Sequence, residues 1–422
     1  MISRLYFIIS PLTMTKTSFE KSKINILLLE WVHESAVETF RENGYTNIEY
    51  IKWALDQDQL IEKIKDVHFI WIRSRTKLTK EVLSHAKRLK SIGCFCIGTN
   101  KVDLETAKEM GVAVFNAPFS NTRSVAELVI AEIILLFRGI AEKNALAHSW
   151  GWLKSAVNSY EVRGKNLWIV GYGHIGTQLG ILAEDLGMNV YYYDIEKKLS
   201  LWNVKSKKTF KELLEISDVV SFHVPETKDT KNMFNKETLA YMKEGRYLVN
   251  ASRGTVVEID YLVRYLESGH ILWAAIDVFP SEPKGKGEEF VSPLRAFDNV
   301  ILTPHIGWST LEAQENIGFE VSQKIVTFSD NGSTIWAVNY PEVSLPTFEW
   351  VTRIIHLHMN VPWVLNKINE AFAKNEINIS AQYLQTNDKI GYMVMDVETD
   401  EVANILQELN DIPGTIRARV LY

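Results

Sequence analysis

Short apolar runs alternate with amphipathic stretches along most of the chain. The first series of runs predicts buried strands at 24–29, 68–72, 89–92 and 113–115. A helical pattern starts near Ala36 and is closed by Gly44. A second series predicts strands at 167–170, 190–193, 219–223, 247–250, 274–278 and 300–302. Such alternation is typical of doubly wound parallel sheets, so we expect two α/β lobes connected by the apolar helix 124–137.

The C-terminal part has a different pattern. Strand-like and helical runs follow one another in the order strand, helix, strand, strand, helix, strand, at 352–358, 362–375, 377–384, 391–397, 401–409 and 416–421. This βαββαβ order predicts a ferredoxin-like domain. The expected domains are 14–120 with 307–335, 121–306, and 350–422. Residues 1–13 are interpreted as a spurious or disordered extension, which leaves Met1 and Met14 as alternative starts.

Composition and charge narrow the functional classes. The chain has 422 residues, 46% of them hydrophobic and 23% charged, which is ordinary for globular domains. Its net charge of −6 disfavours nucleic acid as a partner. No apolar stretch reaches the roughly 18 residues of a membrane span, and no convincing signal-peptide cleavage site follows Met1. Cys94 and Cys96 read as reduced thiols, so we expect a cytoplasmic protein with no membrane partner and no metal site.

A glycine-rich turn follows the first strand of the second lobe. Gly171, Gly173 and Gly176 form a G-x-G-x-x-G pattern that opens a helix, and Asp194 ends the next strand. The glycines let the backbone approach a pyrophosphate, whose charge the helix N-terminus stabilises. The Asp194 carboxylate can accept hydrogen bonds from ribose hydroxyls and would repel a 2′-phosphate. The pattern predicts an NAD site; the alternative is a tight turn followed by a surface aspartate.

Three groups suited to the chemistry of 2-hydroxy acids follow predicted strands of the second lobe. They are Arg253, Glu282 and His305. Ligands bind at the carboxyl ends of parallel strands. A guanidinium suits a carboxylate, an imidazole can move a hydroxyl proton, and a carboxylate beside the imidazole favours its protonated form. Each could be a structural residue, but together they predict hydride transfer between a 2-hydroxy acid and a nicotinamide.

Five runs of the sequence resemble the phosphoglycerate dehydrogenase branch of the D-isomer-specific 2-hydroxyacid dehydrogenases. They are 93–100, 116–127, 170–176, 250–254 and 303–307, and the likeness extends from about residue 14 to the C-terminus. The resemblance implies a flavodoxin-like substrate lobe, a Rossmann NAD lobe, and Arg253, Glu282 and His305 as the catalytic set. The NAD contacts that it implies are Gly171, Gly173, His174, Ile175, Gly176, Asp194, Ala251, Ser252, Arg253, Asp277, His305, Gly307 and Trp308.

The resemblance also implies the substrate. The expected reaction is reversible oxidation of 3-phospho-D-glycerate to 3-phosphooxypyruvate, the first step of L-serine biosynthesis. Arg73 and Arg75 follow a predicted strand of the first lobe and would bind the phosphate, although from composition alone they would read as a solvated edge. The full substrate-binding set implied is Lys52, Arg73, Arg75, Asn121, Lys154 and Arg253.

The C-terminal domain resembles an ACT regulatory domain. In this family such domains pair edge to edge and bind serine between subunits, and His358, Asn360 and Asn378 match the ligand-binding positions. An imidazole and two amides suit the groups of an amino acid. Regulation by L-serine and dimerisation alone both remain open, and the family implies a homotetramer.

The tryptophans depart from the family pattern. Of the twelve tryptophans, ten stand where the family has glycine: Trp31, Trp53, Trp71, Trp150, Trp168, Trp202, Trp273, Trp308, Trp350 and Trp363. Trp336 is a further candidate, and Trp152 alone matches a family tryptophan. Overpacking costs about 1–3 kcal/mol per site, and ten such changes would exceed the roughly 5–15 kcal/mol that stabilise a domain. We hypothesise that the gene uses UGA for glycine and that UGA has been translated as tryptophan.

Two alternative functions stay open at this point. One is oxidation or reduction of another 2-hydroxy acid, such as 2-hydroxyglutarate, which Arg73→Ala would distinguish because only a phosphorylated substrate needs that cation. The other is a non-catalytic sensor of NAD or of an amino acid. The presence of Arg253, Glu282 and His305 together argues against the sensor.

Overall fold

The computed structural model describes residues 20–283, 287–347, 351–399 and 401–421. The expected extension 1–13, both alternative starts and Trp350 lie outside the described residues. The chain divides into two compact units, one formed by Met1–Pro118 with Glu315–Tyr422 and the other by Phe119–Gln314. No helix in the described ranges combines the length and the apolar character of a membrane span.

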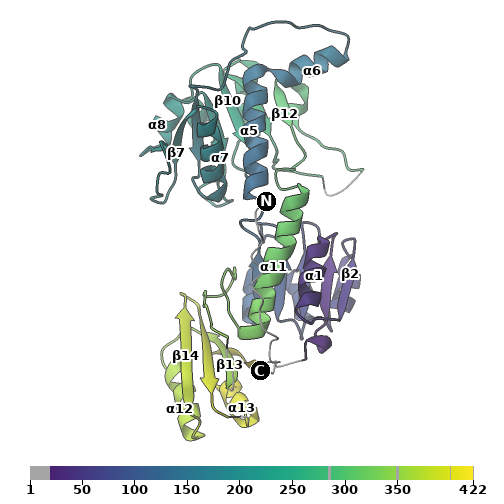
Figure 1. Ribbon diagram of the computed structural model, residues 1–422, viewed down its shortest axis with the longest axis vertical. Helices are drawn as coiled ribbons and strands as arrows, with labels where there is room; N and C mark the ends of the chain where they lie inside the picture. Colours follow the sequence, from purple (N-terminus) through teal and green to yellow (C-terminus); the bar gives the residue numbers. More distant parts are fainter. Residues whose placement is uncertain (1–19, 284–286, 348–350, 400, 422) are drawn as a thin grey trace, which may run out of the picture. The chain divides into compact units, whose positions relative to one another are not determined.

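The first unit contains a five-stranded parallel sheet in the order β2-β1-β3-β4-β5 (Figure 1). Its strands are β1 Ile26–Leu29, β2 Ile48–Ile51, β3 Phe69–Ile72, β4 Ser91–Cys94 and β5 Ala113–Asn116. The helices that connect or cover them are η1 Lys21–Lys23, α1 Glu34–Glu42, α2 Gln57–Ile64, α3 Lys80–Ser84, α4 Leu104–Glu109 and α11 Leu311–Asn331. Four strands match the predicted runs, whereas β2 was not predicted, because this edge strand is only partly buried and has no clear apolar run.

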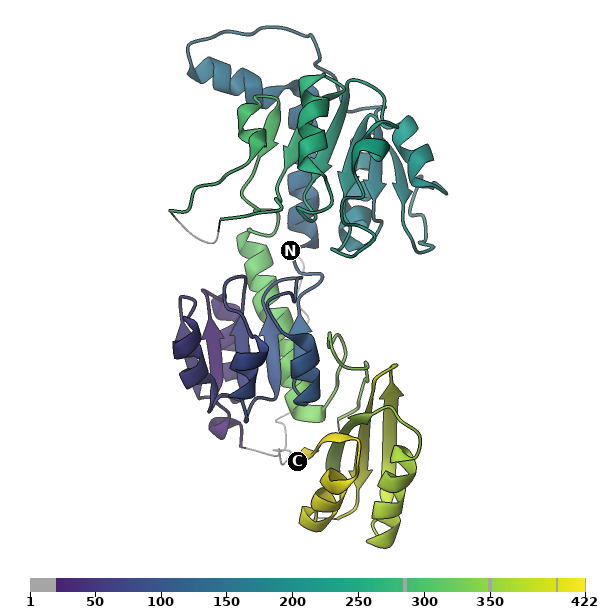
Figure 2. The same cartoon turned by 180° about the vertical axis from the view of Figure 1, so that it is seen from behind.

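The same unit contains a four-stranded antiparallel sheet in the order β14-β15-β13-β16 (Figure 2). Its elements are β13 Thr352–Met359, α12 Val364–Lys374, β14 Ile379–Thr386, β15 Ile390–Val397, α13 Ala403–Asp411 and β16 Thr415–Leu421. The predicted βαββαβ order is confirmed. Because Ile354 packs with the two helices while Ile355 joins the core of the parallel sheet, both faces of β13 are buried.

A buried ion pair supports this sheet. The guanidinium of Arg353 on β13 donates two hydrogen bonds, of 2.6 and 2.7 Å, to the carboxylate of Asp396 on β15. Arg353 also donates to the backbone carbonyls of Asn331 and Pro346, which ties the strand to the end of α11. Paired charges and satisfied donors are the condition under which charges can be buried at acceptable cost.

The second unit contains a seven-stranded parallel sheet in the order β12-β11-β10-β9-β6-β7-β8. Its strands are β6 Asn166–Val170, β7 Asn189–Tyr193, β8 Lys205–Ser206, β9 Val219–Phe222, β10 Arg246–Asn250, β11 Ile271–Ile276 and β12 Val300–Leu302. Its helices are α5 Thr122–Arg138, α6 Ile140–His148, α7 His174–Asp185, α8 Phe210–Glu215, α9 Lys236–Leu239, α10 Ile259–Glu267 and η2 Pro293–Ala296. Separate apolar cores lie on the two faces of the sheet, so the predicted doubly wound fold is confirmed.

The strand order of the second unit reverses beside β6. The chain passes from β6 outward through β7 to β8, and β9 then pairs with the other side of β6. A reversal of this kind creates a crevice at the carboxyl ends of the strands, where open α/β sheets bind ligands. The turn that follows β6 is the glycine-rich segment singled out in the sequence.

Candidate active site

The glycine-rich turn joins β6 to α7 in a geometry that requires glycine. Gly171 has a φ of +91°, and a Cβ there would lie 2.3 Å from the carbonyl oxygen of His223. A Cβ on Gly176 would lie 2.2 Å from the carbonyl oxygen of Gly171. A Cβ on Gly173, by contrast, would meet no atom within 4 Å, so the backbone there is open. With the N-terminus of α7 immediately after it, this open turn fits a pyrophosphate.

Asp194 is held at the end of β7 by the turn itself. One carboxylate oxygen accepts a hydrogen bond from the backbone N–H of Tyr172 at 2.8 Å, and the other from Glu196 at 2.9 Å. Each oxygen retains a second lone pair for a ribose hydroxyl. At the start of α7, the ring of His174 packs against Phe119 at a centroid distance of 4.2 Å. The neighbouring Ile175 belongs to the partly buried edge of the core beneath.

The segment after β10 forms a tight turn that presents Arg253. The side chain of Asn250 accepts from the N–H and hydroxyl of Ser252 and donates to the carbonyl of Arg253. A Cβ on Gly254 would lie 2.0 Å from the carbonyl carbon of Phe279, so this turn touches the segment after β11. Ala251 is partly buried within the turn. The Arg253 guanidinium donates to the carbonyl of Ser252, and it makes no other hydrogen bond in the described ranges.

Asp277 organises the loop that carries His305. Its buried carboxylate accepts hydrogen bonds from the hydroxyl of Thr303 at 2.6 Å and from the N–H groups of Ile306 at 2.8 Å and Gly307 at 2.9 Å. Between these anchors His305 has a φ of +54°, a left-handed conformation that is uncommon for a residue other than glycine. The backbone is therefore held in a strained conformation so that the imidazole points in a defined direction.

His305 and Glu282 are directly paired. The Nδ1 atom of His305 lies 3.0 Å from both carboxylate oxygens of Glu282. Burial raises the pKa of Glu282, but the hydrogen bond and charge of His305, the Phe279 N–H and the charge of Arg253 outweigh it and lower the pKa below its usual range. The carboxylate is therefore ionised and orients the ring, which leaves Nε2 for a ligand. The turn that carries Arg253 packs against the segment that leads to Glu282, because a Cβ on Gly254 would touch Phe279.

The structure adds one acidic residue that sequence reasoning missed. Glu132 lies on α5 and is buried beside Asp277. Burial, together with the negative charge of Asp277, raises the pKa of Glu132 to about 8, so the side chain is neutral at pH 7. Glu132 is the one polar residue in the run 128–137, and this was the sequence feature that could have indicated it.

In the first unit, three of the predicted phosphate-binding residues lie near the end of β1. The carboxylate of Glu30 accepts hydrogen bonds from the backbone N–H groups of Arg73, Arg75 and Thr76, which fixes the turn after β3. The Arg73 guanidinium donates to the carbonyls of Glu30 and Trp31. Burial lowers its pKa. The Arg75 side chain is exposed.

Lys52 belongs to the same region. Its exposed ammonium lies over the ring of Trp31, 4.7 Å from the centroid. The role of Glu30, whose carboxylate fixes the backbone turn that carries Arg73 and Arg75, was not predicted. A buried carboxylate beside cations gives no pattern in the sequence.

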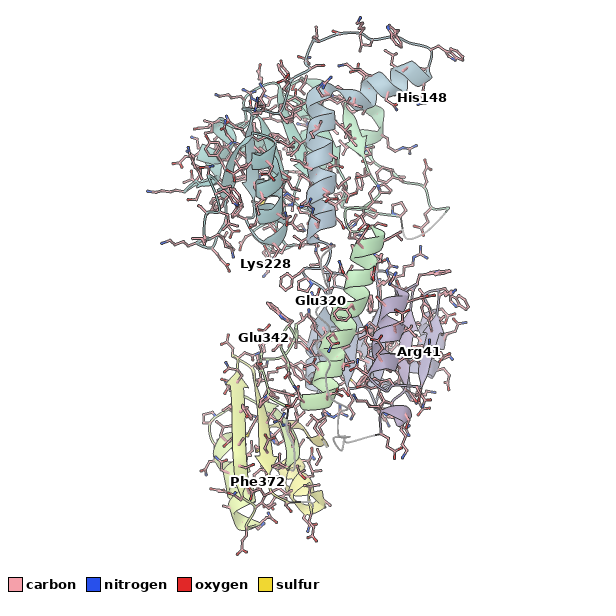
Figure 3. All side chains as sticks on the ribbon, viewed as in Figure 1. Arg41, His148, Lys228, Glu320, Glu342 and Phe372 are labelled. Carbon is pink, nitrogen blue, oxygen red and sulfur yellow. The ribbon has the colours of Figure 1, made fainter. Side chains whose placement is uncertain are left out.

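Asn121 and Lys154 occupy opposite ends of α5. Asn121 precedes the helix, is buried, and has a side-chain oxygen without a partner among the described residues. Lys154 is exposed in the segment after α6, beyond the other end of α5 (Figure 1). The labelled His148 and Lys228 mark these two ends of the unit, with Lys228 in the loop after β9 (Figure 3). The structure therefore does not bring Lys154 to the edge where His305 lies.

The predicted effector residues are split between two ends of the antiparallel sheet. His358 is buried near the end of β13, its Nδ1 lies 3.3 Å from Nδ1 of His356, and burial lowers its pKa. Asn360 follows β13 and donates to the carbonyl of Asn387. Asn378 is exposed before β14. Because Met359 pairs with Ile390 at one end of β15 while β14 starts opposite Val397 at the other, one chain does not bring Asn378 to the other two.

Taken with the fold, these groups define a class of protein: an NAD-dependent oxidoreductase acting on 2-hydroxy acids. Residues 130–307 match the family described as "D-isomer specific 2-hydroxyacid dehydrogenase, NAD binding domain", and residues 354–417 match an "AHAS small subunit-like ACT domain". Among solved structures, D-lactate dehydrogenase from Aquifex aeolicus, complexed with NAD and lactic acid, superposes with a TM-score of 0.63 at 28% identity, over 72% of this chain and 95% of that one. The TT0316 protein from Thermus thermophilus gives 0.64 at 30% identity, over 72% and 96%.

Curated relatives make the assignment narrower. D-3-phosphoglycerate dehydrogenase from Haemophilus influenzae is 60% identical over 407 residues, which cover 96% of this chain and 99% of the relative. The enzyme of the same name from Escherichia coli K12 is 58% identical over 411 residues, 97% of this chain and 100% of the relative. The chain belongs to the D-3-phosphoglycerate dehydrogenase family. The predicted family, cofactor and ACT-type domain are confirmed.

Proposed function

We propose that the chain catalyses the reversible oxidation of 3-phospho-D-glycerate to 3-phosphooxypyruvate with NAD, the first step of L-serine biosynthesis. The observation that carries the proposal is the pairing of Glu282 with His305 at the carboxyl edge of the seven-stranded sheet, with the turn that carries Arg253 packed against the segment after β11. The names of relatives that match nearly the whole chain support the proposed substrate. We also propose that the protein is cytoplasmic.

Each side chain has a defined part in the reaction. The Arg253 guanidinium binds the substrate carboxylate, because its donors other than the one bonded to Ser252 are available and form a planar fork. His305 Nε2 takes the proton of the C2 hydroxyl as the carbonyl forms, and Glu282 stabilises the resulting imidazolium through Nδ1. NAD held by the glycine turn and Asp194 would supply the acceptor for the hydride that leaves C2. In the reverse direction His305 returns the proton.

The binding residues divide between cofactor and substrate. Gly171, Gly173 and Gly176 fit the pyrophosphate, and Asp194 fits the ribose hydroxyls. We assign the substrate phosphate to Lys52, Arg73 and Arg75, and a further polar contact to Asn121. The guanidinium of Arg73 is already aimed by two backbone carbonyls, so little side-chain entropy is lost when it binds an anion.

The C-terminal domain is proposed to bind L-serine and to regulate the enzyme. Since one chain keeps Asn378 away from His358 and Asn360, the site requires two chains, with Asn378 supplied by the second. This arrangement would make the domain both a dimerisation module and a sensor in a homotetramer. Serine would inhibit only if it binds the less active state more tightly.

A direct assay tests the reaction. NADH formation is followed by absorbance with 3-phospho-D-glycerate and, separately, with D-2-hydroxyglutarate, for the parent chain, Arg73→Ala and the matched control Arg41→Ala on α1. The proposal predicts that Arg73→Ala raises KM for the phosphorylated acid roughly 10- to 100-fold and that Arg41→Ala leaves it unchanged. Equal use of both acids, with no effect of Arg73→Ala, would contradict the assigned substrate.

A further inference from the structure

The backbone at several tryptophans has the conformation of glycine. Trp31, Trp150, Trp202, Trp336 and Trp363 have φ values of +52°, +66°, +54°, +64° and +74°. These are five of the eleven tryptophans in the described ranges, and eleven of the twenty-one described glycines have a positive φ as well. A side chain costs about 1–2 kcal/mol in this region, where glycine fits without strain.

The other large aromatic residues provide an internal control. The sequence has 18 phenylalanines and 16 tyrosines, and none in the described part of the chain has a positive φ. Phenylalanine and tyrosine are therefore kept out of the left-handed region, whereas tryptophan supplies five of the ten residues other than glycine that adopt it in the described part of the chain. We propose that the functional protein carries glycine at these five positions, because its gene uses UGA as a glycine codon. The same proposal covers the other tryptophans that stand where the family has glycine, which are Trp53, Trp71, Trp168, Trp273, Trp308 and Trp350.

Two buried tryptophans support the same conclusion by a different argument. The indole N–H groups of Trp71 and Trp168 are buried without a hydrogen-bond partner among the described residues. A buried indole N–H normally has a partner, and leaving it without one is costly. The Trp71 indole also fills the space over Gly93, where a Cβ would lie 2.2 Å from its Nε1. Glycine at 71 and 168 would remove both orphan donors.

The substitution matters for the proposed phosphate site. Trp31 stands between Lys52 and Arg73: its ring lies under the Lys52 ammonium, and its carbonyl accepts from the Arg73 guanidinium. Glycine at this position keeps the carbonyl contact and removes the indole from the ammonium. The Lys52 ammonium would then no longer lie against an indole ring. This consequence rests on the proposed function, whereas the argument from φ does not.

Codon inspection and paired substitutions test the proposal. UGA codons at Trp31, Trp150, Trp202, Trp336 and Trp363 are expected, and the protein purified from its own cells should have glycine there by peptide mass spectrometry. UGG codons, or tryptophan in the native peptides, would overturn it. The Trp152 codon, by contrast, should be UGG.

Glycine and alanine variants separate backbone strain from loss of the indole. At Trp150 and Trp202, both exposed, glycine is expected to favour the folded state over alanine roughly 5- to 30-fold, because alanine retains the Cβ. At Trp152, which is exposed with an ordinary φ, alanine should be at least as good as glycine. Alanine matching glycine at both positive-φ positions would overturn the strain argument, and chemical denaturation of the full chain measures the difference.

A separate observation concerns a cluster of cations in the first unit. A cavity of about 30 Å³ is lined by His68, Lys90, Ser329 and Arg419, together with apolar groups. The Nη2 atom of Arg419 is buried without a hydrogen-bond partner, and no ion pair joins Lys90 or Arg419 to a carboxylate in the described ranges. Arg417 lies beside them and donates to the carbonyls of Leu89 and Met110. Lys90 and Arg419 therefore place two basic side chains beside a cavity whose described lining includes no carboxylate.

We infer that this cavity binds a small inorganic anion between Lys90 and Arg419. A buried guanidinium nitrogen needs an acceptor, and the cavity is large enough for one small ion or for water. Burial lowers the pKa of Lys90 to about 7, an effect that the charges of Arg417 and Arg419 increase. An anion would reverse it. Because Lys90 immediately precedes β4 and Arg419 lies on β16, the ion would link the parallel sheet to the C-terminal sheet.

Thermal unfolding in chloride, sulfate and phosphate at matched ionic strength tests this site. The full chain carries Arg73→Ala throughout, which removes the proposed substrate-phosphate contact. One of the three anions should stabilise this parent, by roughly 100-fold in the folded-to-unfolded ratio at about 100 times its Kd. Lys90→Met and Arg419→Met should abolish the response, whereas the exposed Lys87→Met should keep it. The inference is overturned if no anion stabilises the parent or if Lys90→Met responds like Lys87→Met.

Discussion

The carboxylate of Glu282 meets the imidazole of His305 with both oxygens 3.0 Å from Nδ1. This pairing determines which ring nitrogen exchanges a proton with the substrate. Nδ1 is hydrogen-bonded to Glu282, so Nε2 is the nitrogen that remains. The strained backbone of His305, held on one side by Thr303 and on the other by Ile306 and Gly307, keeps the pair in place.

Glu282→Gln should lower kcat roughly 10²- to 10⁴-fold, because a neutral amide stabilises the imidazolium less well and can select the wrong tautomer. Glu282 acts through His305, so the pH profile is the decisive measurement. The pH profile of kcat/KM should change in the variant, because the ionised carboxylate that contacts the ring is gone. A fall in rate with an unchanged pH profile would indicate a purely structural role.

Glu132→Gln should stabilise the protein at alkaline pH. The pKa of Glu132 rises on folding from its ordinary value of 4.5 to about 8, so the unfolded chain loses this proton before the folded chain does. The free energy of unfolding therefore falls as pH rises from about 5 to 8, by an amount on the order of a few kcal/mol. Glu132→Gln removes the titrating group and avoids that loss. Chemical denaturation between pH 5 and 9 measures it. The exposed Glu127→Gln on the same helix should behave like the parent, and parallel curves for all three proteins would refute the assignment.

Arg353→Met should destabilise the first unit by about 3–5 kcal/mol, since it leaves the carboxylate of Asp396 buried and unpaired. The double variant Arg353→Met with Asp396→Leu should recover much of that loss, because no isolated charge remains. Urea denaturation of the single and double variants gives the comparison. If the loss of unfolding free energy in the double variant equalled the sum of the losses in the two single variants, an unpaired buried charge would not be the cause of those losses.

His358→Ala and Asn378→Ala should each abolish serine inhibition when present alone. Because the proposed site takes His358 from one chain and Asn378 from another, a mixed oligomer of the two variants contains some interfaces in which both residues at one site are intact. Co-expression of differently tagged chains, followed by an inhibition assay of the mixed species, should restore part of the response. No recovery in a confirmed mixed oligomer would place the site within one chain.

The sequence predicted the elements whose pattern is local. The G-x-G-x-x-G turn, the strands of the seven-stranded sheet and the βαββαβ order followed from periodicity and turn residues. The edge strand β2 was missed because half-burial gives no clear run. Strand ends also shifted: the run predicted at 89–92 became Ser91–Cys94, since pairing with β3 and β5 determines where the strand ends.

The site was harder to predict where it depends on long-range contacts. Arg253, Glu282 and His305 could be proposed because each follows a strand. The buried role of Glu30 could not, because a carboxylate that holds a turn has no local pattern. For Glu132 the apolar run around it was a local sign of burial, but its position beside Asp277 depends on a long-range contact. The separation of Lys154 from His305 depends on the direction of α5, and that of Asn378 from His358 on antiparallel pairing.

The most direct test of the account is NADH formation from 3-phospho-D-glycerate by the parent chain and by His305→Gln. The assay is run on the chain both with the tryptophans as printed and with glycine at Trp31, Trp150, Trp202, Trp336 and Trp363, and NADH binding is measured by fluorescence alongside. His305→Gln should lose at least about 100-fold in kcat in whichever form is active, while cofactor binding is retained. A His305→Gln enzyme that turns over at the parent rate would show that this imidazole does not move the proton.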